Sequence, residues 1–544
     1  MKHYRSVAFA ALAVASSLSL ANGPVSYERL LRADQEPGNW LMYSGNYRGH
    51  RYSRLDQITP ANAHRLRPKW VYQMRTTHKV ETSPLVVDGI MYLTRPPNDV
   101  VALDTETGRE LWYYRYKVPD KVYVCCGQVN RGLAVLGNRL FMGTVDAKLV
   151  ALDIRSGREL WKTEVTDYTQ GYAVTVAPLP LKDKVIIGVA GGEYGIRGFI
   201  DAYEAETGKR AWRFYTVPGP DEPNFGTWDG DSWKTGGSSI WVTGAFDPDL
   251  NLTYWGTGNP GPDWNGENRR GDNLYSDCMV ALDPDTGKLR WYFQYTPHDV
   301  HDWDSVQVPV LVDAPFRGRQ RKLLLHANRN GFFYVLDRAT GEFLLGRPYV
   351  KQTWATGLDA KGRPLRVPDT FPTESGVVVW PGVTGGQNWY SPSYSPATGL
   401  YYVAAQEQGN IYFKAEATYK PGTNFTGGGG KPIPSEPGWG AVRAIVPETG
   451  DIKWEHRLLT PPWAGLLATA GNVVFGGTTE GNFFALDART GKHLWRFPAG
   501  GQVIANPISY SSGAKQQVAI AAGDVLIAFA LEESGAPVTP SRRD

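Results

Sequence analysis

The sequence VALDTETGRELW, residues 101–112, is the first of seven similar segments. In most of them a short apolar or β-branched run leads into an acidic turn that closes on Thr-Gly or Ser-Gly, and a second run ends in an aromatic residue. Strand formers on both sides of a glycine turn are typical of a β-hairpin. The other six segments are residues 150–161, 201–212, 280–291, 334–345, 443–454 and 484–495.

The spacing of these hairpins indicates the larger fold. Trp112 and Trp161 are 49 residues apart, Trp161 and Trp212 are 51 apart, and Trp454 and Trp495 are 41 apart. A period of about 40–50 residues, with about four strands in each, is typical of β-propeller blades.

Two longer intervals interrupt the repeat. Residues 218–272 form an insertion rich in Gly, Asn, Asp, Pro and Trp, and the interval after Leu345 has room for one extra blade. Counting that blade and the strand that ends near Trp70, we expect an all-β, eight-bladed propeller with short helices only in loops. Seven blades are the alternative.

Composition excludes several functional classes. The 544 residues carry a net charge of +3, and lysine and arginine are spread along the chain, so no basic footprint for nucleic acid or for a membrane surface is present. The chain contains 61 glycines, 19 tryptophans and 29 tyrosines, which suits many short strands and tight turns better than a helical bundle.

The N-terminus has the features of a secretory signal peptide. Lys2 and Arg5 precede an apolar run over residues 7–20, and small residues fit a cleavage site before Asn22. The run is shorter than the roughly 18–20 apolar residues of a spanning helix, so we favour export to the periplasm over a membrane anchor. We expect a signal peptide at 1–21, one catalytic propeller domain at 22–531 and a flexible tail at 532–544.

The chain has three cysteines, and two of them, Cys125 and Cys126, are neighbours, while Cys278 is left over. A disulfide between neighbours closes almost no loop, so it adds little stability and would serve instead to shape a surface. Two unbonded thiols are the alternative. No CxxCH motif is present, which excludes a covalently attached c-type haem on this chain.

Residues 295–305, YTPHDVHDWDS, hold an unusual density of acidic and imidazole groups. If the chain is extended here, Asp302 and Asp304 point to one face, and His301 and Trp303 point to the other. Two carboxylates on one face favour a hard cation as their counter-charge. A solvated acidic loop is the alternative for such a pair taken alone.

Six segments, in order, resemble the motifs of the quinoprotein alcohol dehydrogenases, which include methanol and ethanol dehydrogenases that use pyrroloquinoline quinone (PQQ). The resemblance covers essentially the whole mature chain and includes the rare Cys-Cys pair. The segments are NWLMYSGNYRGHRYSRLDQITPAN (39–62), VCCGQVNRGLA (124–134), IIGVAGGEYGIRGFIDAY (186–203), YWGTGNPGPDWN (254–265), TPHDVHDWD (296–304) and LATAGNVVFGGTTEGNFFALD (467–487).

This resemblance implies a set of cofactor contacts. The planar quinone would lie between the indole of Trp241 and a Cys125–Cys126 disulfide ring, which explains why such a ring would be kept. The carboxylates of the cofactor make arginine a reasonable partner. The remaining cofactor-binding residues that the resemblance implies are Glu81, Arg131, Thr175, Gly191, Gly192, Ser239, Arg329, Asn388 and Trp463.

The resemblance also implies a metal and a catalytic base. Glu193, Asn259 and Asp302 would bind the ion through oxygen, which suits calcium and disfavours zinc or copper. Asp302 would remove the alcohol proton as hydride passes to the quinone, and Arg329 would stabilise charge on the quinone oxygen. Calcium-type members carry a small uncharged residue two places after the base. Lanthanide-dependent members carry aspartate there, so Asp304 predicts a lanthanide, with calcium as the alternative.

Several functional readings remain to be separated. The resemblance implies an alcohol substrate and a separate periplasmic cytochrome c as electron acceptor, while the short C-terminal segment leaves substrate size, and therefore methanol specificity, open. Whether the chain forms a homodimer is open too. One rival is a non-catalytic propeller of the outer-membrane assembly type, which shares the hairpin repeat. A second rival is a hydrolase with a transition metal on His298 and His301.

Overall fold

The computed structural model describes residues 23–532. The predicted signal peptide at 1–21 lies outside the described residues, as does the predicted tail beyond Glu532. Helices are short. The one α-helix within 23–532 is α1 (Tyr27–Leu31), and the 3-10 segments are η1 (Ala33–Gln35), η2 (Ala63–Arg65), η3 (Tyr168–Gln170), η4 (Gly192–Tyr194), η5 (Phe225–Thr227), η6 (Ser232–Thr235) and η7 (Pro368–Thr370). No helix in this range has the length and apolar character needed to cross a membrane.

Small antiparallel sheets make up the rest, which confirms the predicted all-β propeller fold with few helices. Eight sheets within residues 23–532 have four or more strands. The first three are β3 (Leu85–Val87), β4 (Ile90–Arg95), β5 (Asp99–Asp104) and β6 (Glu110–Tyr114); β7 (Ala134–Leu136), β8 (Arg139–Gly143), β9 (Lys148–Asp153) and β10 (Glu159–Glu164); and β11 (Leu179–Leu181), β12 (Lys184–Gly188), β13 (Phe199–Glu204) and β14 (Arg210–Tyr215).

Three more sheets follow along the chain. They are β15 (Ala245–Asp247), β16 (Leu252–Gly256), β17 (Cys278–Leu282) and β18 (Leu289–Gln294); β19 (Val310–Phe316), β20 (Arg319–Ala327), β21 (Phe332–Asp337) and β22 (Phe343–Pro348); and β26 (Ser393–Ser395), β27 (Leu400–Glu407), β30 (Trp439–Ile445) and β31 (Ile452–Leu458).

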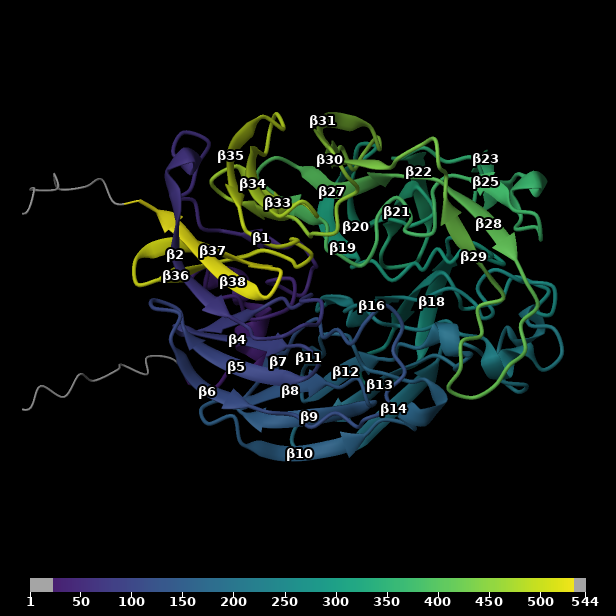
Figure 1. Ribbon diagram of the computed structural model, residues 1–544, viewed down its shortest axis with the longest axis horizontal. Coiled ribbons are helices and arrows are strands. Elements are labelled where there is room, and N and C mark those ends of the chain that lie inside the picture. The colour runs from purple at the N-terminus through teal and green to yellow at the C-terminus, as the bar shows by residue number, and fades with distance from the viewer. Residues whose placement is uncertain (1–22, 533–544) are drawn as a thin grey trace, which may run out of the picture.

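The last two sheets combine strands from both ends of the chain. In one, β1 (Tyr52–Ser53) pairs in parallel with β32 (Leu467–Thr469), which is followed by β33 (Val473–Gly477), β34 (Asn482–Asp487) and β35 (His493–Pro498). In the other, β2 (Leu66–Gln73) pairs with β38 (Val525–Leu531), which is followed by β37 (Lys515–Ala522) and β36 (Ile508–Ser512). Figure 1 shows the purple N-terminal strand β2 beside the yellow C-terminal strands.

Each repeated segment forms the predicted hairpin, as in β5–β6 and β9–β10. The repeated acidic residue stabilises the turn: Asp104 accepts the backbone N–H of Thr107 through its side chain at 2.8 Å. The turn glycine is required as well. Gly157 has a φ of +69°, and a β-carbon there would lie 2.5 Å from the indole of Trp112 in the preceding sheet.

This tryptophan-on-glycine contact explains why both residues recur. The same contact joins Trp70 to Gly108, Trp161 to Gly208, Trp212 to Gly287, Trp291 to Gly341, and Trp454 to Gly491. The segment 334–345 ends in leucine, and there Gly450 meets Leu345 and Arg347 instead. The repeat therefore encodes the packing of each sheet on the next.

Two expectations about the longer intervals are wrong. Between Leu345 and Trp454 the structure has one four-stranded sheet, β26–β27–β30–β31, and the repeated segment 443–454 itself belongs to it, so no extra blade is present. The rest of the interval holds two smaller sheets. One pairs β23 (Ala355–Leu358) with β24 (Pro364–Arg366), and the other joins β25 (Val377–Val379) to β28 (Asn410–Lys414) and β29 (Gly428–Pro432), which lie between β27 and β30. The segment 218–272 is only partly an insertion, because β15 and β16 lie within it. Its polar composition masked these two short strands.

Candidate active site

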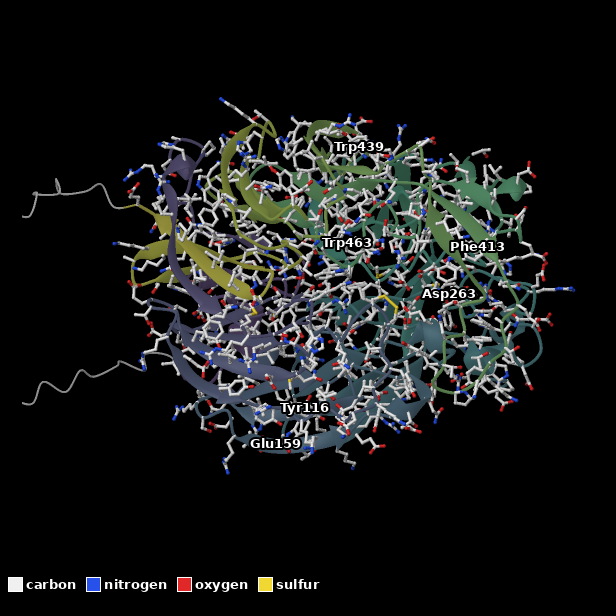
Figure 2. The ribbon with its side chains drawn as sticks, viewed as in Figure 1. Tyr116, Glu159, Asp263, Phe413, Trp439 and Trp463 are labelled. Carbon is white, nitrogen blue, oxygen red and sulfur yellow. A yellow bond between two sulfur atoms is a disulfide. The ribbon has the colours of Figure 1, made fainter. Side chains whose placement is uncertain are left out.

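Loops from several sheets line one cavity of about 840 Å³. Glu81 precedes β3, the Cys125–Cys126 pair lies between β6 and β7, and Glu193 follows β12, whereas Asp302 lies between β18 and β19. Figure 2 shows Trp463 and Asp263, both cavity residues, toward the middle of the molecule, while Tyr116 and Glu159 lie nearer its edge. The volume is within the usual range of about 300–1,000 Å³ for small-molecule sites.

Most of the predicted site residues meet in this cavity. Those on its wall are Glu81, Cys125, Cys126, Arg131, Thr175, Gly191, Glu193, Trp241, Asp302, Asp304, Arg329, Asn388 and Trp463. Gly192, Ser239 and Asn259 are not part of the wall. They lie close behind it, because a β-carbon on Gly192 would lie 3.2 Å from Ser239 Oγ, and the N–H of Asn259 donates to Asp304 Oδ1 at 3.0 Å.

Cys125 and Cys126 form a disulfide, so the alternative of two unbonded thiols is wrong, and Cys278 is a free, buried thiol. The two sulfur atoms and a Glu193 oxygen lie within 4.8 Å of one another, and in residues 23–532 no other three His, Cys, Asp or Glu residues come so close. Disulfide sulfurs are not thiolates, so this trio is no metal centre. It places the disulfide directly beside Glu193.

Arg131 contacts two of the aromatic residues on the cavity wall. Its guanidinium lies 4.7 Å from the ring of Trp241 and 5.0 Å from that of Trp389. It also pairs with Glu81 at 2.8 Å and donates to Thr175 Oγ1 at 2.9 Å. These contacts hold the cation over the two indole rings, so it is oriented before any anionic ligand arrives.

The acidic motif is a loop, so the expected extended strand is wrong: Asp302 has a φ of +60°. The expected grouping of side chains nevertheless holds. Arg329 pairs with Asp304 and lies 3.5 Å from Asp302, while His301 stacks on Trp303 with ring centroids 4.2 Å apart. Both aspartates line the cavity, so a solvated acidic loop is excluded.

Burial and mutual repulsion favour the protonated forms of the cavity carboxylates. Burial, with a further contribution from the charge of Asp304, raises the pKa of Glu193 to about 7. Burial also raises the pKa of Asp302 well above its ordinary value; Asp304 adds to this shift, and Arg329 opposes it. A bound cation would reverse these effects, since it stabilises the charged forms.

Asp263 is a cavity residue that the sequence reasoning missed. Asp263 is 1% exposed, and neither of its carboxylate oxygens accepts a hydrogen bond of normal geometry. The side chain of Asn259 nevertheless favours the charged form of this carboxylate. Burial and the charge of Glu193 raise the pKa of Asp263 well above its ordinary value. The available signal was an aspartate four residues after the predicted ligand Asn259, but its Pro-Asp context is typical of a turn.

The predicted ligands fit a planar, anionic cofactor held together with a hard cation. A disulfide and an indole offer flat surfaces, Arg131 and Arg329 offer positive charge, and the orphaned oxygens of Asp263 leave acidic charge that no hydrogen bond satisfies. All the non-sulfur donors are oxygen atoms, which favours a hard ion over zinc or copper.

The histidine-based rival does not fit. His298 Nδ1 lies 3.0 Å from the carbonyl of Gly271, and His301 Nε2 lies 2.8 Å from that of Thr370. Each ring therefore already has one nitrogen hydrogen-bonded to a backbone carbonyl, and the two carbonyls belong to different segments. Neither histidine is on the cavity wall.

This site, with a disulfide, an indole and several carboxylates in one cavity of a propeller, is the one that the resemblance to the quinoprotein oxidoreductases implied. A family model described as glucose/ethanol/alcohol dehydrogenase, beta-propeller domain, matches residues 40–348. A second, outer membrane protein assembly factor BamB, matches residues 439–536.

Known relatives cover nearly the whole chain. The quinoprotein alcohol dehydrogenase PedH of Pseudomonas putida is 40% identical over 95% of this chain and 91% of its own length. A lanthanide-dependent methanol dehydrogenase of Methylacidiphilum fumariolicum is 39% identical over 94% of this chain and 89% of its own. The solved structure of a europium-containing methanol dehydrogenase has a TM-score of 0.88 at 35% identity, and the match covers 93% of this chain and 100% of that one. The chain belongs to the PQQ-dependent alcohol dehydrogenase family, as the sequence motifs predicted.

Proposed function

We propose that this chain oxidises an alcohol to an aldehyde or a ketone with PQQ and one metal ion in the cavity. The observation that carries the proposal is the meeting of the Cys125–Cys126 disulfide, Trp241, Glu193 and Asp302 on one cavity wall, although they come from loops far apart in sequence. The bound quinone would supply an acceptor for the hydride of the alcohol carbon, and the cation would supply a Lewis acid that makes this acceptor stronger.

The protein residues would bind and orient the cofactor and would take the proton of the substrate hydroxyl. Trp241 and the disulfide would hold a planar ring and exclude water, and Arg131, already fixed by Glu81 and Thr175, would bind an anionic edge. Asp302 would take the proton of the substrate hydroxyl at its carboxylate. Arg329, 3.5 Å from Asp302, would orient that carboxylate.

Glu193, Asn259, Asp302 and Asp304 would hold the ion, and we propose a lanthanide, with calcium as the alternative. Three carboxylates in one site suit a trivalent charge better than a divalent one. The similarity to a lanthanide-dependent methanol dehydrogenase and to a europium-containing one supports this choice. Arg329 currently neutralises Asp304, so ion binding would have to compete with that pair.

The eight sheets with four or more strands would be the blades of one closed ring. Support comes from the tryptophan-on-glycine contacts between successive sheets and from the pairing of β2 with β38. A ring brings loops from every sheet to one place, which is what the cavity requires.

We further propose export to the periplasm and electron transfer to a separate cytochrome c. The apolar N-terminal run supports export, and the absence of CxxCH from the sequence means that the chain offers no site for a covalent haem of its own. Alcohol-dependent reduction of a purified c-type cytochrome, followed by its absorbance, would test the acceptor.

The test of the function is reconstitution of the purified chain with PQQ and either lanthanum or calcium, assayed by dye reduction over primary, secondary and bulky alcohols. One equivalent of bound quinone and alcohol-dependent turnover are expected, with turnover lost in Asp302→Asn. A chain that binds no quinone and reduces no dye would instead be a scaffold of the outer-membrane assembly type.

A further inference from the structure

Asp263 is the most poorly satisfied acid on the cavity wall. The side chain is 1% exposed and lines the cavity, and neither of its two oxygens accepts a hydrogen bond of normal geometry. A buried carboxylate without a partner is costly, so natural proteins pair it or let it bind a metal.

The charges around Asp263 are mostly negative. Glu193 exerts the largest charge effect on it, Asp304 adds to the repulsion, and Asp263 in turn acts on Asp302. Arg269 is the cation that opposes this repulsion. Its guanidinium is already committed to the carbonyls of Pro262 and Asp299 and to Asn273 Oδ1. Asn259 also favours the charged form of Asp263, but the nearby arginine has other partners, so no cation is paired with this carboxylate.

The loop that carries Asp263 is fixed on both sides. Before it, Arg269 Nε donates to the carbonyl of Pro262 at 3.1 Å, and after it the N–H of Trp264 donates to the carbonyl of Thr426 at 2.9 Å. The same loop positions Asn259, whose N–H donates to Asp304. A predicted ligand and the orphaned carboxylate are thus held by one anchored segment.

Resting on the proposed function, we infer that Asp263 is a further ligand of the ion held by Glu193, Asn259, Asp302 and Asp304. The site then has four carboxylates, and with Arg329 beside them the ionised groups carry a formal charge of −3. A trivalent ion would neutralise this charge, whereas a divalent ion would leave one negative charge. Asp263 would therefore add to the preference for a lanthanide.

The test uses europium(III) alone as the probe on the full metal-free chain. Luminescence lifetimes in H₂O and D₂O count the water molecules on the bound ion, and a titration gives the dissociation constant. Asp263→Ala should admit about one more water and weaken binding by about tenfold or more. Asp231→Ala is the matched control. Asp231 is an acid in the same 218–272 segment, but its side chain is 80% exposed, so its removal should not change europium binding.

Three outcomes separate the possibilities. If Glu193→Ala weakens europium binding but Asp263→Ala leaves the water count unchanged, Asp263 is not a ligand, and the proposed function stands. If neither substitution affects binding, the ion is not in this cavity, and the proposed function fails as well. Should Asp263→Ala not fold, Asp263→Asn keeps the shape and removes the charge, and unweakened binding by that variant would overturn the inference.

Discussion

Asp304 is the residue that most directly distinguishes a trivalent from a divalent ion. It lies against Arg329 and accepts the N–H of Asn259 at 3.0 Å. Asp304→Ala should lower lanthanum-supported turnover by about tenfold or more and change calcium-supported turnover far less, because it removes one negative ligand. Steady-state rates with each metal would show this. Equal losses with both metals would remove the reason to prefer a lanthanide.

A second residue-scale prediction concerns His326. Burial lowers its pKa from 6.5 to about 3, and it stacks on Tyr295 with ring centroids 4.7 Å apart. At a pH between about 3 and 6.5, the unfolded chain binds one more proton at His326 than the folded chain does. The free energy of unfolding should therefore fall by about 1.4 kcal/mol for each pH unit below 6.5.

His326→Phe removes that proton while it keeps an aromatic ring on Tyr295. Urea unfolding at pH 8, 6 and 5 should therefore show a stability advantage of the native chain that shrinks as the pH falls. The loss of the hydrogen bond to Gln307 adds an offset that does not change with pH. A difference that stays constant between pH 8 and 5 would mean that His326 is not buried as a neutral ring.

Local sequence predicted the site unevenly. Asp302 and Asp304 were recognisable because two acids flank an aromatic residue, and Cys125–Cys126 because the pair is rare. The positive φ of Asp302 was not recognisable, since the residue is not a glycine and no local turn signal marks it. Asp263 was missed because a Pro-Asp pair in a glycine-rich loop resembles a solvated turn, and only folding buries it.

At the scale of elements, the hairpin turn should be intolerant of a β-carbon wherever a tryptophan covers it. Gly157→Ala combines a positive φ with a contact of 2.5 Å to Trp112, whereas Gly513 has a φ of +57° and no atom within 4 Å of the added carbon. Gly513→Ala should cost about 1–2 kcal/mol from strain alone. Gly157→Ala should cost about 1–3 kcal/mol more from overpacking, as chemical denaturation would measure. Equal costs would mean that the tryptophan contact does not matter.

The repeat predicted the hairpins well because each turn is stabilised by its own residues, such as Asp104 and Gly108. It predicted the blades between repeats less well. The extra blade expected after Leu345 is absent from the structure. The prediction was wrong because sequence length alone does not distinguish a blade from the small sheets β23–β24 and β25–β28–β29. The pairing of β2 with β38 spans almost the whole chain and has no local signal.

For the molecule as a whole, ion binding should stabilise the fold, because it relieves repulsion among carboxylates carried by several sheets. At a free lanthanum concentration of 100 times the dissociation constant, linkage predicts about 2.7 kcal/mol of added stability. Calorimetry with and without lanthanum would detect this as a rise in melting temperature. Glu193→Ala should lose most of the rise, and an equal rise in that variant would place the ion elsewhere.

The most direct measurement is anomalous diffraction from crystals of the chain loaded with PQQ and lanthanum. The account predicts one strong anomalous peak in the cavity, within about 2.3–2.6 Å of oxygen atoms of Glu193, Asn259 and Asp302, where hard-ion ligands lie. A lanthanum peak outside the cavity, or a quinone bound away from Trp241 and the Cys125–Cys126 disulfide, would contradict it.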